Sequence, residues 1–234
     1  MAKNKNKKTD SQALLESPDF LREKLTQTED YIEHHKGLVF SIMGVLVAAI
    51  IGFFVFRYYI RSQNNKAETD MFQAIYYYEA DSLNKALSGD GNNLGFLDVI
   101  DEYPLTKTGN LAHFYAGIIY LKKGQYDNAI EQLSKFKSND IAVQARSFSL
   151  IGDAYMEKGD FSQAGIFYRK AADYKPNEYL TPQYLEKAAN AYEKLMDYES
   201  ASDCYNKIIT DFYSSSHYQN ALKQKARVDG LAKK

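Results

Sequence analysis

The 234-residue chain has few of the residues that build most catalytic and metal sites. Its single cysteine excludes a disulfide framework and a zinc site of the multi-cysteine type. It has only four histidines, and no GxSxG, phosphate-loop or HExxH motif occurs in it. Its 29 basic and 30 acidic residues lack the basic surplus typical of nucleic-acid-binding proteins. We therefore expect no enzymatic activity, no cofactor, no metal, no small-molecule substrate and no nucleic-acid partner.

Proline is also scarce, with four residues, whereas tyrosine and phenylalanine are plentiful, with 20 and 13. Few prolines favour helices, because proline breaks helical backbone. The abundance of Ala, Leu, Lys and Glu points the same way, because these residues have high helix propensity. The hydrophobic share of 45% is enough for a sizeable core. The composition predicts an all-α protein.

One segment carries no charge at all. Residues 38–56 read LVFSIMGVLVAAIIGFFVF, and 19 residues of helix span about 28 Å, close to the thickness of the hydrocarbon core of a bilayer. Arg57, Tyr58 and Arg61 follow the run and are typical interfacial anchors. The run is too long, and too far from the start of the chain, for a cleaved signal peptide. We predict a transmembrane helix over 37–60.

Small residues recur at every fourth position of this predicted span. Gly44, Ala48 and Gly52 would form a smooth stripe against which a partner helix can pack closely. The alternative is that they only reflect the general abundance of small residues in membrane helices.

The residues before the span are expected to form a cytoplasmic tail, 1–36. Lysines and arginines are balanced, three against three, near the two ends of the span, so charge alone does not decide the orientation. The lysine-rich start and the lack of a signal sequence favour a cytoplasmic N-terminus. Leu21, Leu25 and Ile32 share one helix face, which indicates either a short amphipathic helix or a solvated lead-in.

The remainder of the chain contains an internal repeat. Gly117 and Tyr120 recur 35 residues later as Gly152 and Tyr155, and a third copy has Ala189 in the glycine position. Small residues also recur in the second half of each copy, at Ala129, Ala164 and Ala201. A period near 35 residues indicates stacked supersecondary units.

These residues resemble the tetratricopeptide repeat (TPR), whose period is about 34 residues. The resemblance implies pairs of antiparallel helices, A and B, in which the Gly or Ala of helix A meets the Ala of helix B. The tryptophan usual in helix A is replaced by His113, Phe148 and Leu185. We expect His113 to be a packed core histidine and the lone Cys204 to be a small core residue.

The expected fold is all-α, with a single transmembrane helix followed by a TPR-like α-solenoid of antiparallel helix pairs. One long helix is expected over 66–88, and a second over 94–103. The TPR domain, 61–234, is divided into a divergent repeat at 66–104, repeats at 110–143, 145–178 and 182–213, and a capping helix at 216–232.

The resemblance also implies a groove lined by the A helices. The residues expected there grade from apolar in the first repeat to polar and acidic in the third: Leu111, Phe114, Ile118, Leu121, Arg146, Ser149, Asp153, Met156, Gln183, Glu186, Asn190 and Glu193. A solvated face is the alternative reading. A weak calcium-loop pattern at 90–101 has Leu94 where a ligand is required.

The whole layout is similar to that of the YfgM-like family of bacterial inner-membrane proteins. The resemblance implies an ancillary subunit of the Sec translocon that works beside a periplasmic chaperone and receives exported chains. It implies a single-pass inner-membrane protein with a cytoplasmic N-terminus and a periplasmic TPR domain. The alternative is a scaffold for another envelope complex, in secretion, cell division or outer-membrane biogenesis.

Overall fold

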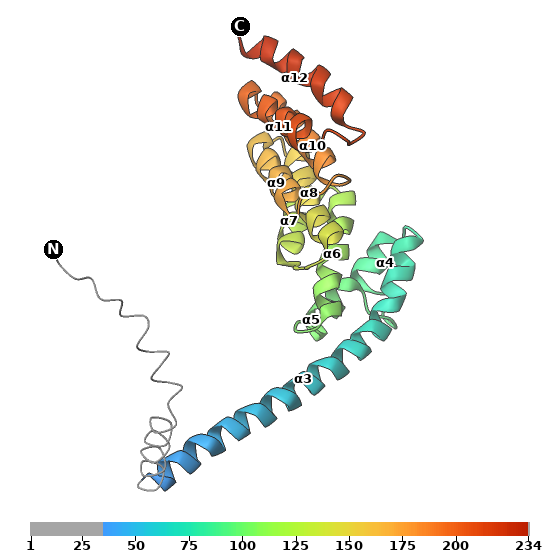
Figure 1. Ribbon diagram of the computed structural model, residues 1–234. Helices are drawn as coiled ribbons and strands as arrows, with labels where there is room; N and C mark the ends of the chain where they lie inside the picture. The colour runs from blue at the N-terminus through green and yellow to red at the C-terminus, as the bar shows by residue number, and fades with distance from the viewer. Residues whose placement is uncertain (1–34, 234) are drawn as a thin grey trace, which may run out of the picture. The chain divides into compact units, whose positions relative to one another are not determined.

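The computed structural model describes residues 35–233, and the helix expected in the N-terminal tail lies outside them. The chain divides into two compact units, Met1–Tyr59 and Ile60–Lys234. Within the described residues every regular element is a helix, which confirms the all-α prediction (Figure 1). In chain order the helices are α3 (Lys36–Glu79), α4 (Leu83–Ser88), α5 (Phe96–Glu102), α6 (Lys107–Lys122), α7 (Tyr126–Lys135), α8 (Ile141–Glu157), α9 (Phe161–Asp173), α10 (Thr181–Lys194), α11 (Tyr198–Asp211) and α12 (Tyr218–Ala232).

The apolar run lies in α3, and its large side chains are exposed. Apart from half-buried Val39, their exposed fractions run from 50% at Met43 to 69% at Val45. The most apolar 18-residue window of α3 has a mean hydropathy of 2.8, and none of it is buried. Among the described residues, α3 is the one helix long and apolar enough to cross a membrane.

The single helix expected over 66–88 is two helices, so that expectation was wrong. Three residues separate α3 from α4, and Asp81 adopts a left-handed φ of 54°. The Asp81 amide donates to the carbonyl of Tyr78 at 3.1 Å, and the Ser82 amide donates to that of Tyr77 at 2.8 Å. Hydrogen bonds of this kind, from amides just after a helix to carbonyls of its last turn, are typical of a helix C-terminus. No glycine or proline marks this stop in the sequence, which is why it was missed.

The first part of the second unit is built around Phe96 of α5. The Phe96 side chain is fully buried and stacks on Tyr115 of α6, with ring centroids 5.0 Å apart. The C-terminal part of α3 joins the same core, and the Tyr103 hydroxyl donates to Asp70 of α3 at 2.5 Å. The helices α3, α4, α5 and α6 therefore share one hydrophobic cluster.

The remaining helices pack as successive hairpins, α6 with α7, α8 with α9 and α10 with α11, and α12 follows α11 (Figure 1). This arrangement confirms the predicted solenoid. We call α6, α8 and α10 the A helices, and α7, α9 and α11 the B helices.

The contact between an A helix and its B helix differs in one respect from the expectation. A Cβ added to Gly117 would lie 2.5 Å from Leu133 Cγ, and one added to Gly152 would lie 2.7 Å from the Tyr168 ring. The glycines thus face large side chains of the B helices, not the expected alanines. They keep the helices close by making room for a bulky neighbour, since even one methyl group would overlap it.

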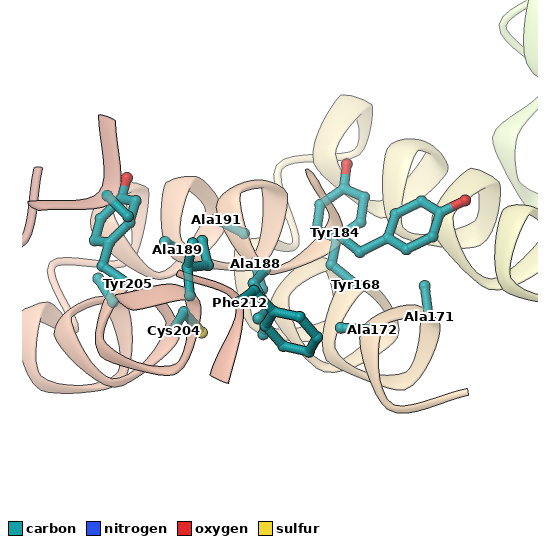
Figure 2. Packing of buried hydrophobic residues seen from close by; sticks show 14 of the residues in the cluster. Tyr168, Ala171, Ala172, Tyr184, Ala188, Ala189, Ala191, Cys204, Tyr205 and Phe212 are labelled. Atoms are coloured by element: carbon teal, nitrogen blue, oxygen red, sulfur yellow. The ribbon is translucent and has the colours of Figure 1, made fainter. Parts of the chain in front are cut away.

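The core of the last repeats is rich in alanine, as Figure 2 shows around α9, α10 and α11. Four alanines of α10 and α11 are fully buried, and they leave space for the larger buried side chains of Tyr205 and Ile208. Small residues allow neighbouring helices to approach, and the aromatic rings fill what remains. Cys204 lies in this cluster and is 1% exposed, as expected for a core residue.

Each turn between an A helix and its B helix contains one residue in the left-handed backbone conformation. Gly124 and Gly159 have φ of 71° and 76°. The third repeat places Met196 at the same point, with φ of 62° and a side chain that is 75% exposed. The turn geometry is thus kept where the sequence no longer provides glycine.

Candidate protein-interaction surface

We call the twelve residues expected to line the groove the A-helix surface. In the first repeat this surface is less open than the sequence suggests. Phe114 and Ile118 are only 8% and 9% exposed, and they pack in one cluster with Leu133, Phe136 and Ile151. Their burial corrects the expectation of four open apolar side chains, because residues of α7, its C-terminal end and α8 pack against them. Half-buried Leu111 and Leu121 complete this apolar end.

In the second repeat the structure brings Ser149 and Asp153 together with a residue that the sequence did not single out. Lys187 Nζ, from α10, donates to Asp153 at 2.8 Å and to Ser149 Oγ at 3.2 Å. The Tyr168 hydroxyl donates to the same Asp153 carboxylate at 2.6 Å. Burial, and then the bond to Asp153, raise the pKa of Tyr168. The acidic group expected to face the groove is therefore neutralised within it.

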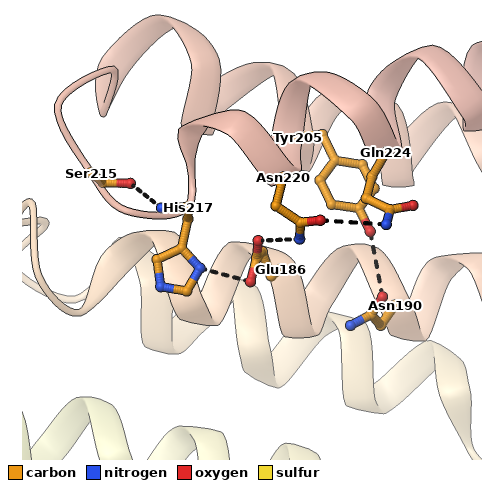
Figure 3. A network of polar contacts seen from close by, with 7 residues as sticks. All are labelled: Glu186, Asn190, Tyr205, Ser215, His217, Asn220 and Gln224. Atoms are coloured by element: carbon orange, nitrogen blue, oxygen red, sulfur yellow. Dashed lines mark hydrogen bonds and ion pairs between the residues drawn. The ribbon is translucent and has the colours of Figure 1, made fainter.

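Glu186 of the third repeat is also held by hydrogen bonds (Figure 3). Its carboxylate lies 2.7 Å from His217 Nδ1 and accepts from the Asn220 amide at 2.8 Å. Both partners come from the segment that begins α12. Glu186 is thus oriented by α12 and is not a free negative charge.

Glu193 completes the series. It accepts from the Tyr205 hydroxyl at 3.0 Å and from the Arg227 guanidinium at 2.5 Å. Burial, and then the bond to Glu193, raise the pKa of Tyr205. The same hydroxyl also lies 3.4 Å from Asn190 Oδ1, a contact drawn in Figure 3. Asn190 itself is exposed.

These contacts show that α12 continues the A-helix surface. Three bonded pairs are separated by 34 residues, which is one repeat: Asp153 with Lys187, Glu186 with Asn220, and Glu193 with Arg227. From the sequence, α12 was expected only to cap the array. The signal that could have found its role is the spacing, because His217, Asn220, Gln224 and Arg227 each follow a predicted surface residue by 34 positions.

Arg146, Gln183 and Met156 of the A-helix surface take no part in the contacts described above. Arg146 is exposed, and in the part of the chain that the structure describes it forms no ion pair. Gln183 and Met156 are half-buried. The surface therefore carries one unpaired cation beside a row of hydrogen-bonded acidic side chains.

The expected packing stripe of the membrane span lies on the exposed part of α3. A Cβ added at Gly44 or Gly52 would meet nothing within 4 Å. Ala48 is likewise exposed. The stripe is therefore free of contacts within the described residues.

Cys204, His113 and Asp90 were the other candidates for a catalytic or metal-binding role, and each is held in contacts within the fold. Burial raises the pKa of the Cys204 thiol to about 11. His113 is half-buried, and its Nδ1 lies 2.7 Å from Gln132 Oε1. The Asp90 carboxylate accepts from the backbone amides of Asn92 and Asn93, which forms an Asx turn.

The comparisons with known families agree with this architecture. Two family models described as tetratricopeptide repeat match the chain, one over residues 111–140 and the other over 145–178. No curated protein matches it. The matched segments fall on the hairpins α6–α7 and α8–α9, and α10–α11 has the same hairpin form. TPR repeats are interaction modules, and they are typically scaffolds without catalytic activity. The repeat matches and the helical solenoid together support a TPR protein.

Proposed function

We propose that this protein is a membrane-anchored interaction module whose A-helix surface binds a segment of a partner polypeptide. The observation that carries the proposal is that the acidic residues along that surface are held in hydrogen bonds or ion pairs. Asp153, Glu186 and Glu193 each bond to a group from the next helix of the same face. A surface of paired charges and amides, with apolar side chains at one end, suits a polypeptide segment of low charge.

Two variants test whether the A-helix surface binds a partner. Arg146→Gln removes an exposed group without touching the core, whereas Lys187→Met releases Asp153 from its partner. We expect both to weaken partner binding, the second more strongly, because it leaves an uncompensated carboxylate on the surface. A matched exposed control is Lys135→Gln on α7. Unchanged binding in both test variants would contradict the assignment.

We further propose that the protein is a single-pass protein of the bacterial inner membrane. In this arrangement α3 crosses the lipid bilayer, the N-terminus is cytoplasmic and the TPR domain is periplasmic. Protease added to spheroplasts tests the orientation: it should digest the TPR domain and leave the N-terminal tail intact. Resistance of the TPR domain, with a known periplasmic control digested, would reverse the orientation.

Within that location we favour an ancillary subunit of the Sec translocon that assists the export and folding of envelope proteins. The support is the layout, a lysine-rich tail, one span and a repeat domain, and its similarity to the YfgM-like family. Anchoring would raise the concentration of the A-helix surface near chains emerging from the translocon. The Gly44, Ala48 and Gly52 stripe would then pack against a transmembrane helix of a partner.

The second candidate is a scaffold for another envelope complex, which the same surface would also suit. A tagged purification from native membranes in mild detergent, followed by mass spectrometry, separates the two. Enrichment of translocon subunits or a periplasmic chaperone, lost in Gly44→Leu but kept in Ala49→Leu, supports the first. A different stable assembly without the translocon supports the second.

A further inference from the structure

A hollow on helix α9 forms a second surface that shares no residue with the A-helix surface. Its volume is about 610 Å³. Four side chains of α9 line it, and the spacings 166–169–173 and 166–170–173 place them on one side of the helix: Ile166, Arg169, Lys170 and Asp173. Aromatic side chains from the neighbouring elements complete the lining: Phe148, Tyr174 and Tyr192. The hollow is thus lined by apolar and by charged side chains, and we call Ile166 with the aromatic side chains its apolar wall.

The apolar part of the hollow is open to solvent. Ile166, which lines the hollow together with the aromatic side chains, is 49% exposed. The rings of Phe148 and Tyr174 meet edge to face with centroids 6.0 Å apart, which fixes that wall. An exposed isoleucine beside fixed rings can accept an apolar side chain with little loss of conformational entropy in the protein.

The charged part of the hollow carries a surplus of positive charge. Asp173 is already paired with Lys207 at 2.8 Å. Among the described residues, neither Arg169 nor Lys170 pairs with a carboxylate. Lys170 Nζ lies instead 4.5 Å from the centre of the Phe148 ring, so it remains available to an incoming anion. Two unpaired cations next to an apolar wall complement a carboxylate next to an apolar side chain.

We propose that this hollow is a second docking site, which binds a segment of a partner protein carrying a leucine or phenylalanine flanked by acidic residues. The apolar side chain packs against Ile166 and the aromatic wall. The acidic side chains pair with Arg169 and Lys170. This binding is independent of the function proposed for the A-helix surface, because the two surfaces have no residue in common.

The probe is a fluorescein-labelled dodecapeptide of glycine and serine with a central leucine and phenylalanine between glutamates. Two matched peptides replace the glutamates by lysines, or the leucine and phenylalanine by serines. Anisotropy is measured with the full-length protein in detergent micelles, with empty micelles as the blank. We expect the acidic apolar peptide to bind about ten-fold more tightly than either of the two matched peptides. It alone gains both the burial of apolar side chains and the pairing of charges. Its affinity should fall as salt is added. Equal binding of the acidic and basic peptides would overturn the proposal.

Variants locate the binding. Ile166→Ser and Lys170→Gln should each weaken the acidic apolar peptide by about five-fold, since each removes one exposed contact. Ile141→Ser, at another exposed isoleucine, and Arg146→Gln, on the A-helix surface, are the matched controls and should bind as the unchanged protein does. Circular dichroism checks that all four remain folded. If Arg146→Gln alone weakens binding, the peptide occupies the A-helix surface: the hollow is then excluded while the proposed function stands.

Discussion

Met196 provides the sharpest test of the turn geometry between A and B helices. A residue with a side chain at φ of 62° is strained by about 1–2 kcal/mol, because its Cβ approaches the following carbonyl oxygen. Glycine removes this strain but gives about 0.4–1 kcal/mol of extra entropy to the unfolded chain. The Met196 side chain is 75% exposed, so its loss removes little packing. Met196→Gly should therefore stabilise the third repeat by about 0.5–1 kcal/mol.

The assay uses Cys204, the only cysteine in the chain, as a reporter. Its thiol is 1% exposed and has its pKa raised to about 11 by burial, so it reacts only when this part of the solenoid opens. When closing is faster than labelling, the labelling rate follows the opening equilibrium. Met196→Gly should slow labelling by about two- to five-fold, since 1.4 kcal/mol corresponds to ten-fold.

Two controls bracket this result. Gly159→Ala makes the reverse change at φ of 76°, where an added Cβ meets nothing within 4 Å, and should speed labelling. Leu195→Gly, one residue before Met196 and in helical conformation, should also speed it, because glycine weakens a helix end. Faster labelling in Met196→Gly would show that the methionine is not strained and would refute the reasoning.

Three further results are expected. The carboxylate of Asp70 raises the pKa of Tyr103 to about 12, above its unfolded value near 10. The contribution of this bond to stability is therefore complete below about pH 10 and is lost as the pH rises towards 12. Urea unfolding should show a lower free energy of unfolding at pH 11.5 than at pH 8, and Tyr103→Phe should make this difference smaller. Gly152→Ala should lower the free energy of unfolding by about 1–2 kcal/mol, because its Cβ would lie 2.7 Å from the Tyr168 ring; an unchanged melting temperature would contradict this packing. Gly230→Ala, with nothing within 4 Å of the added Cβ, should instead raise the free energy of unfolding by about 0.5–1 kcal/mol in the same melts.

The features that the sequence predicts well are those that repeat. Gly117 and Gly152, each followed by a tyrosine three residues later, locate the A helices, because a fixed spacing needs no knowledge of the third dimension. The apolar run 38–56 is equally direct, since its length alone matches a bilayer. The break at Asp81 could not be found, because it depends on backbone hydrogen bonds and not on a glycine or proline.

The A-helix surface was predicted only in part, and the reason is stacking. Assigning Phe114 and Ile118 to an open face requires knowing what the next repeat covers, and the structure places them in a core with Ile151 of α8. Lys187 was missed because its role is to neutralise Asp153 across a repeat boundary, a contact 34 residues away. The residues of α12 were missed although their spacing was readable, because a helix without a following partner resembles a cap.

The most direct test of a polypeptide-binding A-helix surface is site-specific photo-crosslinking in intact cells. A photo-reactive residue is placed at Arg146 or Gln183 on the A-helix surface, and at Lys135 on α7 as the control. The account predicts defined crosslinks to an envelope-protein partner at the first two positions and none at the third. Crosslinking of equal strength at all three, or only at the control, would contradict it.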